Sequence, residues 1–440
     1  MSAVPGDLST DQQPPMTVPL RYFLTGFAFL LAGGGLGLAG VLDAAPGLAR
    51  LAHVHLLLVG WVCLTIMGAM TQFVPVWSNA PLHSRRLANL ALALVAVGVT
   101  GVAWSFLTTS LHWIHGFGGI LLLGIWTFAY NLGRTLAALD GFDATEAHFA
   151  FALACFVLVA LLGFLLAMDF TMRVFPLAGV TRPQVVGAHA TLAVFGAILT
   201  TVLGALYQLA TMFTQTELHG VDHHLARVEY GYPAGVLLLA WGRLVASRPV
   251  ALLGAALMVA GVLAFAAILA RKLYETRVER TPMLTRYAVV AVTLTAWGVL
   301  AAATWASDPL TRSTLFGSTA ATHLLFVGVL GFVVMGSLYH VVPFIVWVHR
   351  YSDRLGFEPV PMIDDLYDDR LAAADGVLLV TGALALILSR AGVLPESAAV
   401  AGGALLVTGF VVFAANLLGV VWKHGRVLSD RTEERAEKAD

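Results

Sequence analysis

The chain has 440 residues, of which 59% are hydrophobic and only 12% are charged, and its formal net charge is −1. A soluble domain of this length would be about 45–50% apolar and about 25% charged. The composition therefore indicates a polytopic membrane protein, and the balanced charge gives no reason to expect a nucleic acid partner. Cys63 and Cys155 are far apart and lie inside apolar runs, which excludes a cysteine-based zinc or iron–sulfur cluster within the chain and argues against a structural disulfide.

A membrane-spanning helix needs about 20 mostly apolar residues. On that basis the sequence predicts twelve helices, over residues 21–43, 51–77, 86–109, 112–136, 146–170, 183–213, 226–247, 249–272, 286–307, 317–348, 371–391 and 397–422. They form one transmembrane domain, 21–424, between a polar N-terminal tail (1–20) and a charged C-terminal tail (425–440), both expected to be flexible. The excess of Lys and Arg on alternate connections predicts a cell-membrane protein with both termini in the cytoplasm.

The second, sixth and tenth predicted helices share a spacing. When Gly68, Gly204 and Gly336 are aligned, a second glycine stands eight residues earlier in each helix, at Gly60, Gly196 and Gly328. A second pattern, glycine followed four residues later by Phe-Ala and then by leucine, recurs in the fourth, eighth and twelfth helices, at Gly124, Gly261 and Gly409. The two patterns predict an all-α protein built from three four-helix repeats in a pseudo-threefold arrangement.

Four of the five histidines in these repeated helices lie close to the same end. His53 and His189 stand fifteen residues before the aligned glycine, whereas His55 and His323 stand thirteen before it. Two residues of an α-helix correspond to a rotation of about 200°. His53 and His55 therefore point to opposite sides of one helix and cannot serve a single pocket.

A pseudo-threefold axis would give each repeated helix one pocket with each neighbour. If a residue fifteen positions before the glycine of one helix pairs with a residue thirteen positions before the glycine of its neighbour, His53 lies with His323 and His55 lies with His189. Two opposed imidazoles match the axial positions of a haem iron, so we expect one or two b-type haems and no copper. The plainer interpretation is that these are hydrogen-bonded structural histidines, but polar groups at membrane depth are rare and usually functional. The third pocket, between Thr191 and Ala321, cannot bind a metal and is expected to be empty.

Three further residues are weaker candidates. His112 and His115 share one face of the fourth helix, where they would line the His55/His189 pocket, hold a metal or, as the sequence favours, bind lipid headgroups. Arg390 would neutralise a haem propionate or anchor headgroups.

The tenth helix carries the most specific motif. It reads Ala321-Thr322-His323 and then Met335-Gly336-Ser337-Leu338-Tyr339-His340-Val341-Val342-Pro343. This resembles the H-x-H…MGGxYHxxP pattern of subunit I of the haem-copper oxidase and nitric oxide reductase superfamily. The resemblance implies twelve helices with threefold repetition, with His53 and His323 as ligands of a low-spin haem. The chain is also similar to NnrS-type haem membrane proteins, which are linked to nitric oxide tolerance.

The departures from the family pattern are informative. Ala321 stands where the family has its high-spin haem ligand, and Ala193 stands where the sixth helix would carry a tyrosine. The adjacent histidine pair that the seventh helix supplies to copper is missing from 226–247. The resemblance therefore implies a low-spin site without the oxygen- or nitric oxide-reducing centre.

Three functions follow, and whether the protein is an enzyme stays open. The first is a b-type cytochrome for electron transfer or for redox- or nitric oxide-related sensing. The second is an oxidoreductase, a terminal oxidase or nitric oxide reductase with an atypical metal site from His189, His112 and His115. The third is a secondary transporter, against which the threefold repetition and the absence of broken helices argue. The expected partners are membrane lipid and a redox partner or second subunit.

Overall fold

The computed structural model describes residues 13–425, which form helices and loops without β-strands. The predicted tails lie mostly outside the described residues. In chain order the helices are α1 (Thr17–Val41), α2 (Ala49–His55), η2 (Leu56–Cys63), α3 (Leu64–Trp77), α4 (Arg85–Leu107), η3 (Leu111–Trp113), α5 (Ile114–Leu136), α6 (Ala144–Met172), α7 (Arg182–Thr191), η4 (Leu192–Leu199), α8 (Thr200–Thr214), α9 (Val221–Glu229), α10 (Tyr232–Leu244), α11 (Arg248–Glu275), α12 (Pro282–Ser307), η5 (Arg312–Thr314), α13 (Thr319–His323), η6 (Leu324–Gly331), α14 (Phe332–Arg350), η7 (Ser352–Arg354), η8 (Ile363–Leu366), α15 (Asp369–Arg390), α16 (Glu396–Val420) and η9 (Val421–Gly425).

Within the described part of the chain, 11 helices are long and apolar enough to cross a membrane. The predicted helix 226–247 is not one of them, because the chain is broken there into α9 and α10. Gly231 is the N-cap of α10, and Pro233, which has no amide hydrogen, stands in its first turn, so the helix restarts instead of continuing. Both α9 and α10 pack along α11, and together they complete one pass through the bundle. The expectation that no helix is broken is wrong at this point.

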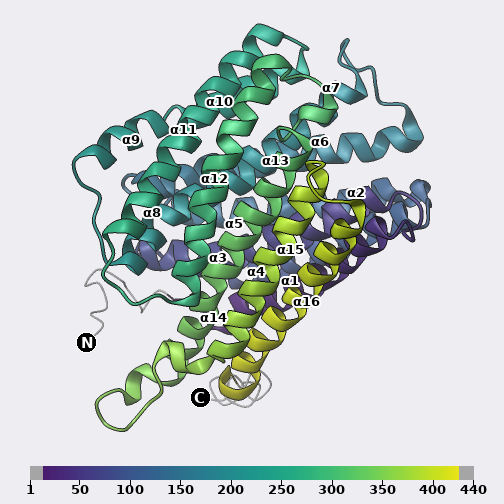
Figure 1. The fold of residues 1–440 in the computed structure, drawn as a ribbon. Helices are drawn as coiled ribbons and strands as arrows, with labels where there is room; N and C mark the ends of the chain where they lie inside the picture. Colours follow the sequence, from purple (N-terminus) through teal and green to yellow (C-terminus); the bar gives the residue numbers. More distant parts are fainter. Residues whose placement is uncertain (1–12, 426–440) are drawn as a thin grey trace.

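The first helix begins earlier than predicted and runs antiparallel to the last. α1 starts at Thr17, four residues before the predicted boundary, because Val18 and Leu20 are buried in the core. Gly34 packs on Phe410, and Leu38 packs on Gly403. The start of α1 and the end of α16 therefore lie at one end of the bundle, which we call the near end; the opposite end is the far end (Figure 1).

The three histidine-bearing passes are the most buried of the candidate spans. They consist of α2–η2–α3, α7–η4–α8 and α13–η6–α14, and Figure 1 shows α2, α7 and α13 towards one end and α3, α8 and α14 towards the other. In each pass an eight-residue π-helix joins the two α-helices. Each π-helix begins twelve residues before the aligned glycine. Such segments in α-helices are rare and often mark functional sites.

The aligned glycines allow close packing against the preceding pass. Gly68, Gly204 and Gly336 receive the side chains of Tyr22, His148 and Arg286, and Gly60, Gly196 and Gly328 receive those of Phe29, Cys155 and Thr293. A Cβ added at Gly60 would lie 2.6 Å from Phe29 Cγ, so a larger residue does not fit there. On each of α1, α6 and α12, the two residues that contact the glycines are seven positions apart. The three helices therefore cross their partner helices in the same register.

Candidate functional site

All four predicted ligand histidines lie at the far end of the bundle, on α2, α7 and α13. The structure brings them together in two pairs. His323 is within electrostatic range of His53, and His189 is within electrostatic range of His55. All four side chains are partly buried.

His53 and His189 are held by the pass that precedes each of them. His53 Nδ1 donates a hydrogen bond to the Gly33 carbonyl at 2.8 Å, and His189 Nδ1 donates to the Val159 carbonyl at 3.2 Å. Four residues beyond each acceptor, a glycine leaves room for the imidazole. A Cβ added at Gly37 would lie 2.5 Å from His53 Cε1, and one added at Gly163 would lie 3.0 Å from His189 Cε1. The two rings therefore occupy matching niches.

His55 and His323 are held by their own helices instead. Their Nδ1 atoms donate to the carbonyls four residues earlier, of Leu51 at 2.8 Å and of Thr319 at 3.4 Å. Each close pair therefore combines one ring that is bonded to the preceding pass with one that is bonded to its own helix.

These hydrogen bonds fix the tautomer of the four rings. A carbonyl oxygen can only accept, so Nδ1 must carry the proton and the Nε2 lone pair stays available in the neutral ring. Across residues 13–425, none of the four Nε2 atoms has a hydrogen-bond partner. Metal-ligating histidines commonly donate their second ring N–H in this way, which fixes the orientation of the ligating nitrogen.

Arg243 lies on the Thr191 side of the third pocket, with a side chain that is only 3% exposed. Its Nη1 donates to Thr191 Oγ1 at 2.7 Å and its Nε donates to the Pro309 carbonyl at 2.9 Å. The guanidinium carbon lies 5.4 Å from the ring centre of Trp305. Ala321 is fully buried.

Of the three weaker candidates, the structure places Arg390 near a predicted histidine pair, whereas, among the described residues, His112 and His115 make no contact with one. Arg390 is within electrostatic range of His323, so it belongs near the first pair. His112 is exposed, and its ring lies against Trp113. Neither His112 nor His115 makes a hydrogen bond, ring contact or electrostatic interaction with His55 or His189 in the part of the chain that is described.

Two buried polar clusters at the near end were not predicted. In the first, His148 Nε2 lies 2.8 Å from Glu229 Oε1, and the Tyr207 hydroxyl donates to Glu229 Oε2 at 3.2 Å. In the second, Arg286 and the Tyr339 hydroxyl both bond to Asp375. The two tyrosines stand three residues after aligned glycines. An acid such as Asp375 inside an apolar predicted helix was the available sequence indication, because such residues are costly in a membrane.

A third acidic group lies near the ends of α9 and α11. Ligand atoms of His219, Asp222 and Glu275 lie within 4.8 Å of one another. Two cations already neutralise the carboxylates, since Arg271 Nε and Lys272 Nζ lie 2.7 and 2.9 Å from Asp222 oxygens. Burial raises the pKa of Asp222, but hydrogen bonds from Arg271, the His219 amide and Lys272 outweigh it and hold the pKa at about 2. We interpret the group as an ion-pair network.

No protein-family model matches the chain, and no curated protein matches it. The chemical interpretation of the far-end histidines therefore depends on their geometry.

Proposed function

We propose that the protein is a membrane-bound b-type cytochrome that holds a low-spin haem between His53 and His323. We propose further that His55 and His189 hold a second haem or another metal. One observation carries both proposals: all four imidazoles keep Nδ1–H on a backbone carbonyl and present an unpartnered Nε2. A purely structural role explains this less well, since metal-ligating histidines commonly donate their second ring N–H to a carbonyl, as all four rings do here.

We infer that the chain is a threefold repeat of four passes, as in the haem-copper oxidase subunit I proteins that its sequence resembles. The equal placement of the π-helices supports this inference, as do the matched contacts of the aligned glycines. The matching niches of His53 and His189 support it further, because they place equivalent rings on equivalent helices.

The residues of the first pair fit a haem. When bound, a haem would supply one-electron redox chemistry. His53 and His323 are the residues that would hold its iron, and the missing side chain of Gly37 gives the His53 ring its place. Arg390 supplies a positive charge on the same side of the bundle, suited to a propionate. The apolar passes around the pair would keep water away.

The contents of the third pocket favour electron transfer or redox-linked sensing over the reduction of oxygen or nitric oxide. Arg243 lies on Thr191, at the place where a resemblance to the haem-copper oxidases would put a reactive centre, and Ala321 offers no ligand. An atypical metal site made of His189, His112 and His115 is less well supported, because His112 is exposed and separate from His189. The break between α9 and α10 in the seventh pass is an observation that supports a secondary transporter.

Spectra of the purified full-length protein test this proposal. After expression with ample haem, reduced-minus-oxidised difference spectra should show sharp low-spin b-type bands, and pyridine-haemochrome analysis should give one or two haems per chain. His53→Ala and His323→Ala should each remove the same set of bands, while His112→Ala should leave the spectrum unchanged. A colourless protein, or bands that survive both His53→Ala and His323→Ala, would overturn the proposal.

A further inference from the structure

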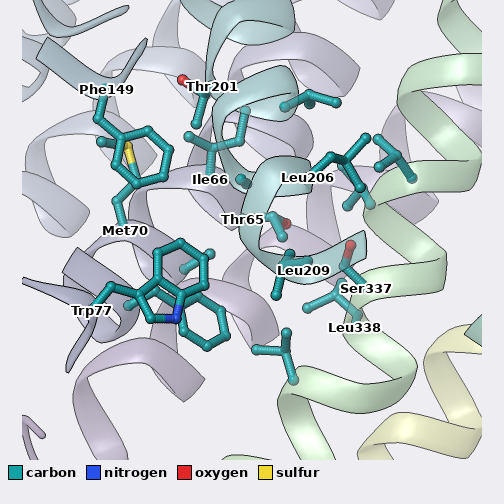
Figure 2. Close-up of a pocket in the computed structure, with 17 residues that line it drawn as sticks. Thr65, Ile66, Met70, Trp77, Phe149, Thr201, Leu206, Leu209, Ser337 and Leu338 are labelled. Carbon is teal, nitrogen blue, oxygen red and sulfur yellow. The ribbon is translucent and has the colours of Figure 1, made fainter. Parts of the chain in front are cut away.

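An apolar cavity with a volume of about 70 Å³ lies where α3, α8 and α14 meet, on the near-end side of the π-helices. Figure 2 shows its lining side chains. They are Thr65, Ile66, Ala69, Met70, Phe73, Trp77, Phe149, Thr201, Val202, Ala205, Leu206, Leu209, Val333, Val334, Ser337, Leu338 and Val341. None of these residues is charged.

The lining residues follow the spacing of the three aligned glycines. Counted from Gly68, Gly204 and Gly336, the positions −3, −2, +1, +2 and +5 of all three passes face the cavity. Five positions on three helices account for fifteen of the 17 lining residues. The remaining two are Trp77 and Phe149. Since equivalent faces of α3, α8 and α14 meet here, the cavity lies on the common axis of the three passes.

Aromatic rings close one end of the cavity. Trp77 stacks on Phe73, with ring centres 4.7 Å apart and an interplanar angle of 12°, and on Phe149, with ring centres 6.2 Å apart and an angle of 13°. Figure 2 shows Trp77 and Phe149 together on one side of the space. In the middle of the cavity the walls are made of small side chains, Ala69 and Ala205 among them.

Two of the three polar side chains in the wall are hydrogen-bonded to protein groups. Thr201 Oγ1 donates to the Ala197 carbonyl at 2.8 Å, and Ser337 Oγ bonds to the Tyr287 hydroxyl at 2.8 Å. Thr65 Oγ1 is buried without a hydrogen-bond partner among the described residues and lies towards Gly26 of α1. A buried water needs two to four polar partners, and one unpaired hydroxyl is fewer than that.

We propose that this cavity binds one small, uncharged apolar molecule of the size of xenon or a diatomic gas. Apolar cavities stay dry, and a cavity of about 150 Å³ in another protein takes up benzene or xenon. The smaller cavity here would exclude benzene-sized ligands. An ion would lose its hydration without gaining partners, so charged ligands are excluded as well. The proposal does not depend on haem, because no histidine contributes to the cavity wall.

Xenon is the probe for this site. Crystals of the full-length protein under xenon pressure should show one anomalous peak between α3, α8 and α14, and xenon-129 NMR should show saturable binding in solution. Ala205→Phe and Ala69→Phe fill the space from two different helices, and each should abolish the peak. Ala302→Phe, at an exposed position of α12, adds the same bulk elsewhere and should leave xenon binding unchanged.

Two results would overturn the proposal. One is the absence of a xenon peak in the cavity of the wild-type protein while other sites on the same molecule are filled. The other is unchanged xenon binding in both filled variants. If a phenylalanine variant does not fold, Ala69→Leu and Ala205→Leu replace it, and the wild-type crystal decides by itself whether the cavity accepts xenon. Haem content, measured on the same samples, reports separately on the cytochrome proposal.

Discussion

Gly37 lies directly against the imidazole of His53, so close that a Cβ on Gly37 would stand 2.5 Å from His53 Cε1. The same helix provides the carbonyl of Gly33 that accepts the Nδ1 hydrogen bond. One turn of α1 thus both binds the His53 ring, through the Gly33 carbonyl, and provides space for it at Gly37. The consequence is that the orientation of His53 depends on a residue that has no side chain.

Gly37→Ala should therefore displace the His53 ring and remove the haem bands that His323→Ala also removes. The substitution overpacks the site and should lower the free energy of unfolding by about 1–3 kcal/mol. Gly35→Ala is the matched control on the same helix, since a Cβ at Gly35 meets nothing within 4 Å. Difference spectra and thermal unfolding of both variants check the prediction, and equal spectra for the two would contradict it.

In the proposed threefold repeat, Ala301 and Ala321 of α12 and α13 correspond to Gly37 and His53 of α1 and α2. Both alanines are fully buried and flank Gly317. Ala321→His should lower the free energy of unfolding by about 1–3 kcal/mol, because the imidazole has no niche. Adding Ala301→Gly should recover part of that loss. Unfolding curves measure both effects, with Thr319→His, at an exposed position of α13, as the control; a double variant no more stable than Ala321→His would refute the assumed equivalence.

Asp375 neutralises Arg286 inside the bundle, with side-chain exposures of 0% and 3%. Asp375→Asn leaves a buried guanidinium without its counter-charge, and we expect a loss of about 3–5 kcal/mol in the free energy of unfolding. Glu358→Gln removes the acid of a solvent-exposed ion pair with Arg354 and should have no measurable effect. Denaturant or thermal unfolding in one detergent compares the two variants. A stable Asp375→Asn protein would show that the pair does not contribute to stability.

The ionisation of Asp222 makes the free energy of unfolding depend on pH. Its pKa is held at about 2, below the ordinary value of 3.8. Because its pKa is lower in the folded state, ionised Asp222 stabilises the folded protein. This stabilisation is complete above the ordinary pKa and is lost as the pH falls through the pKa of the folded state. It amounts to about 2 kcal/mol. Wild type should exceed Asp222→Asn in stability by a constant amount from pH 8 to about pH 4.5. The difference should shrink between pH 4 and pH 2; a difference that changed near pH 6–7 would point to a different titrating group.

Part of the candidate site could be predicted from local periodicity. The spacing of His53, His55, His189 and His323 from the aligned glycines requires only helical geometry, and the structure places these residues at one end of the bundle, with His189 in electrostatic range of His55 and His323 in range of His53. That these pairs hold a cofactor stays a prediction. The break in the seventh pass was missed because apolar composition does not reveal where Gly231 and Pro233 end a helix. The π-helices were missed because their sequences are as apolar as their surroundings.

The amino-acid sequence by itself determined a helical membrane protein with histidines at two registers, since burial in lipid selects apolar runs and helical rotation places every residue on a face. The tertiary structure decided what those faces meet. Only the packing of separate passes could put Arg243 on Thr191, Glu229 on His148 and Asp375 on Arg286. It also decided that Nδ1 of His53 and of His189 each finds a carbonyl of the preceding pass, and that a cavity remains between α3, α8 and α14. Such contacts join residues far apart in the chain, whereas sequence periodicity describes one helix at a time.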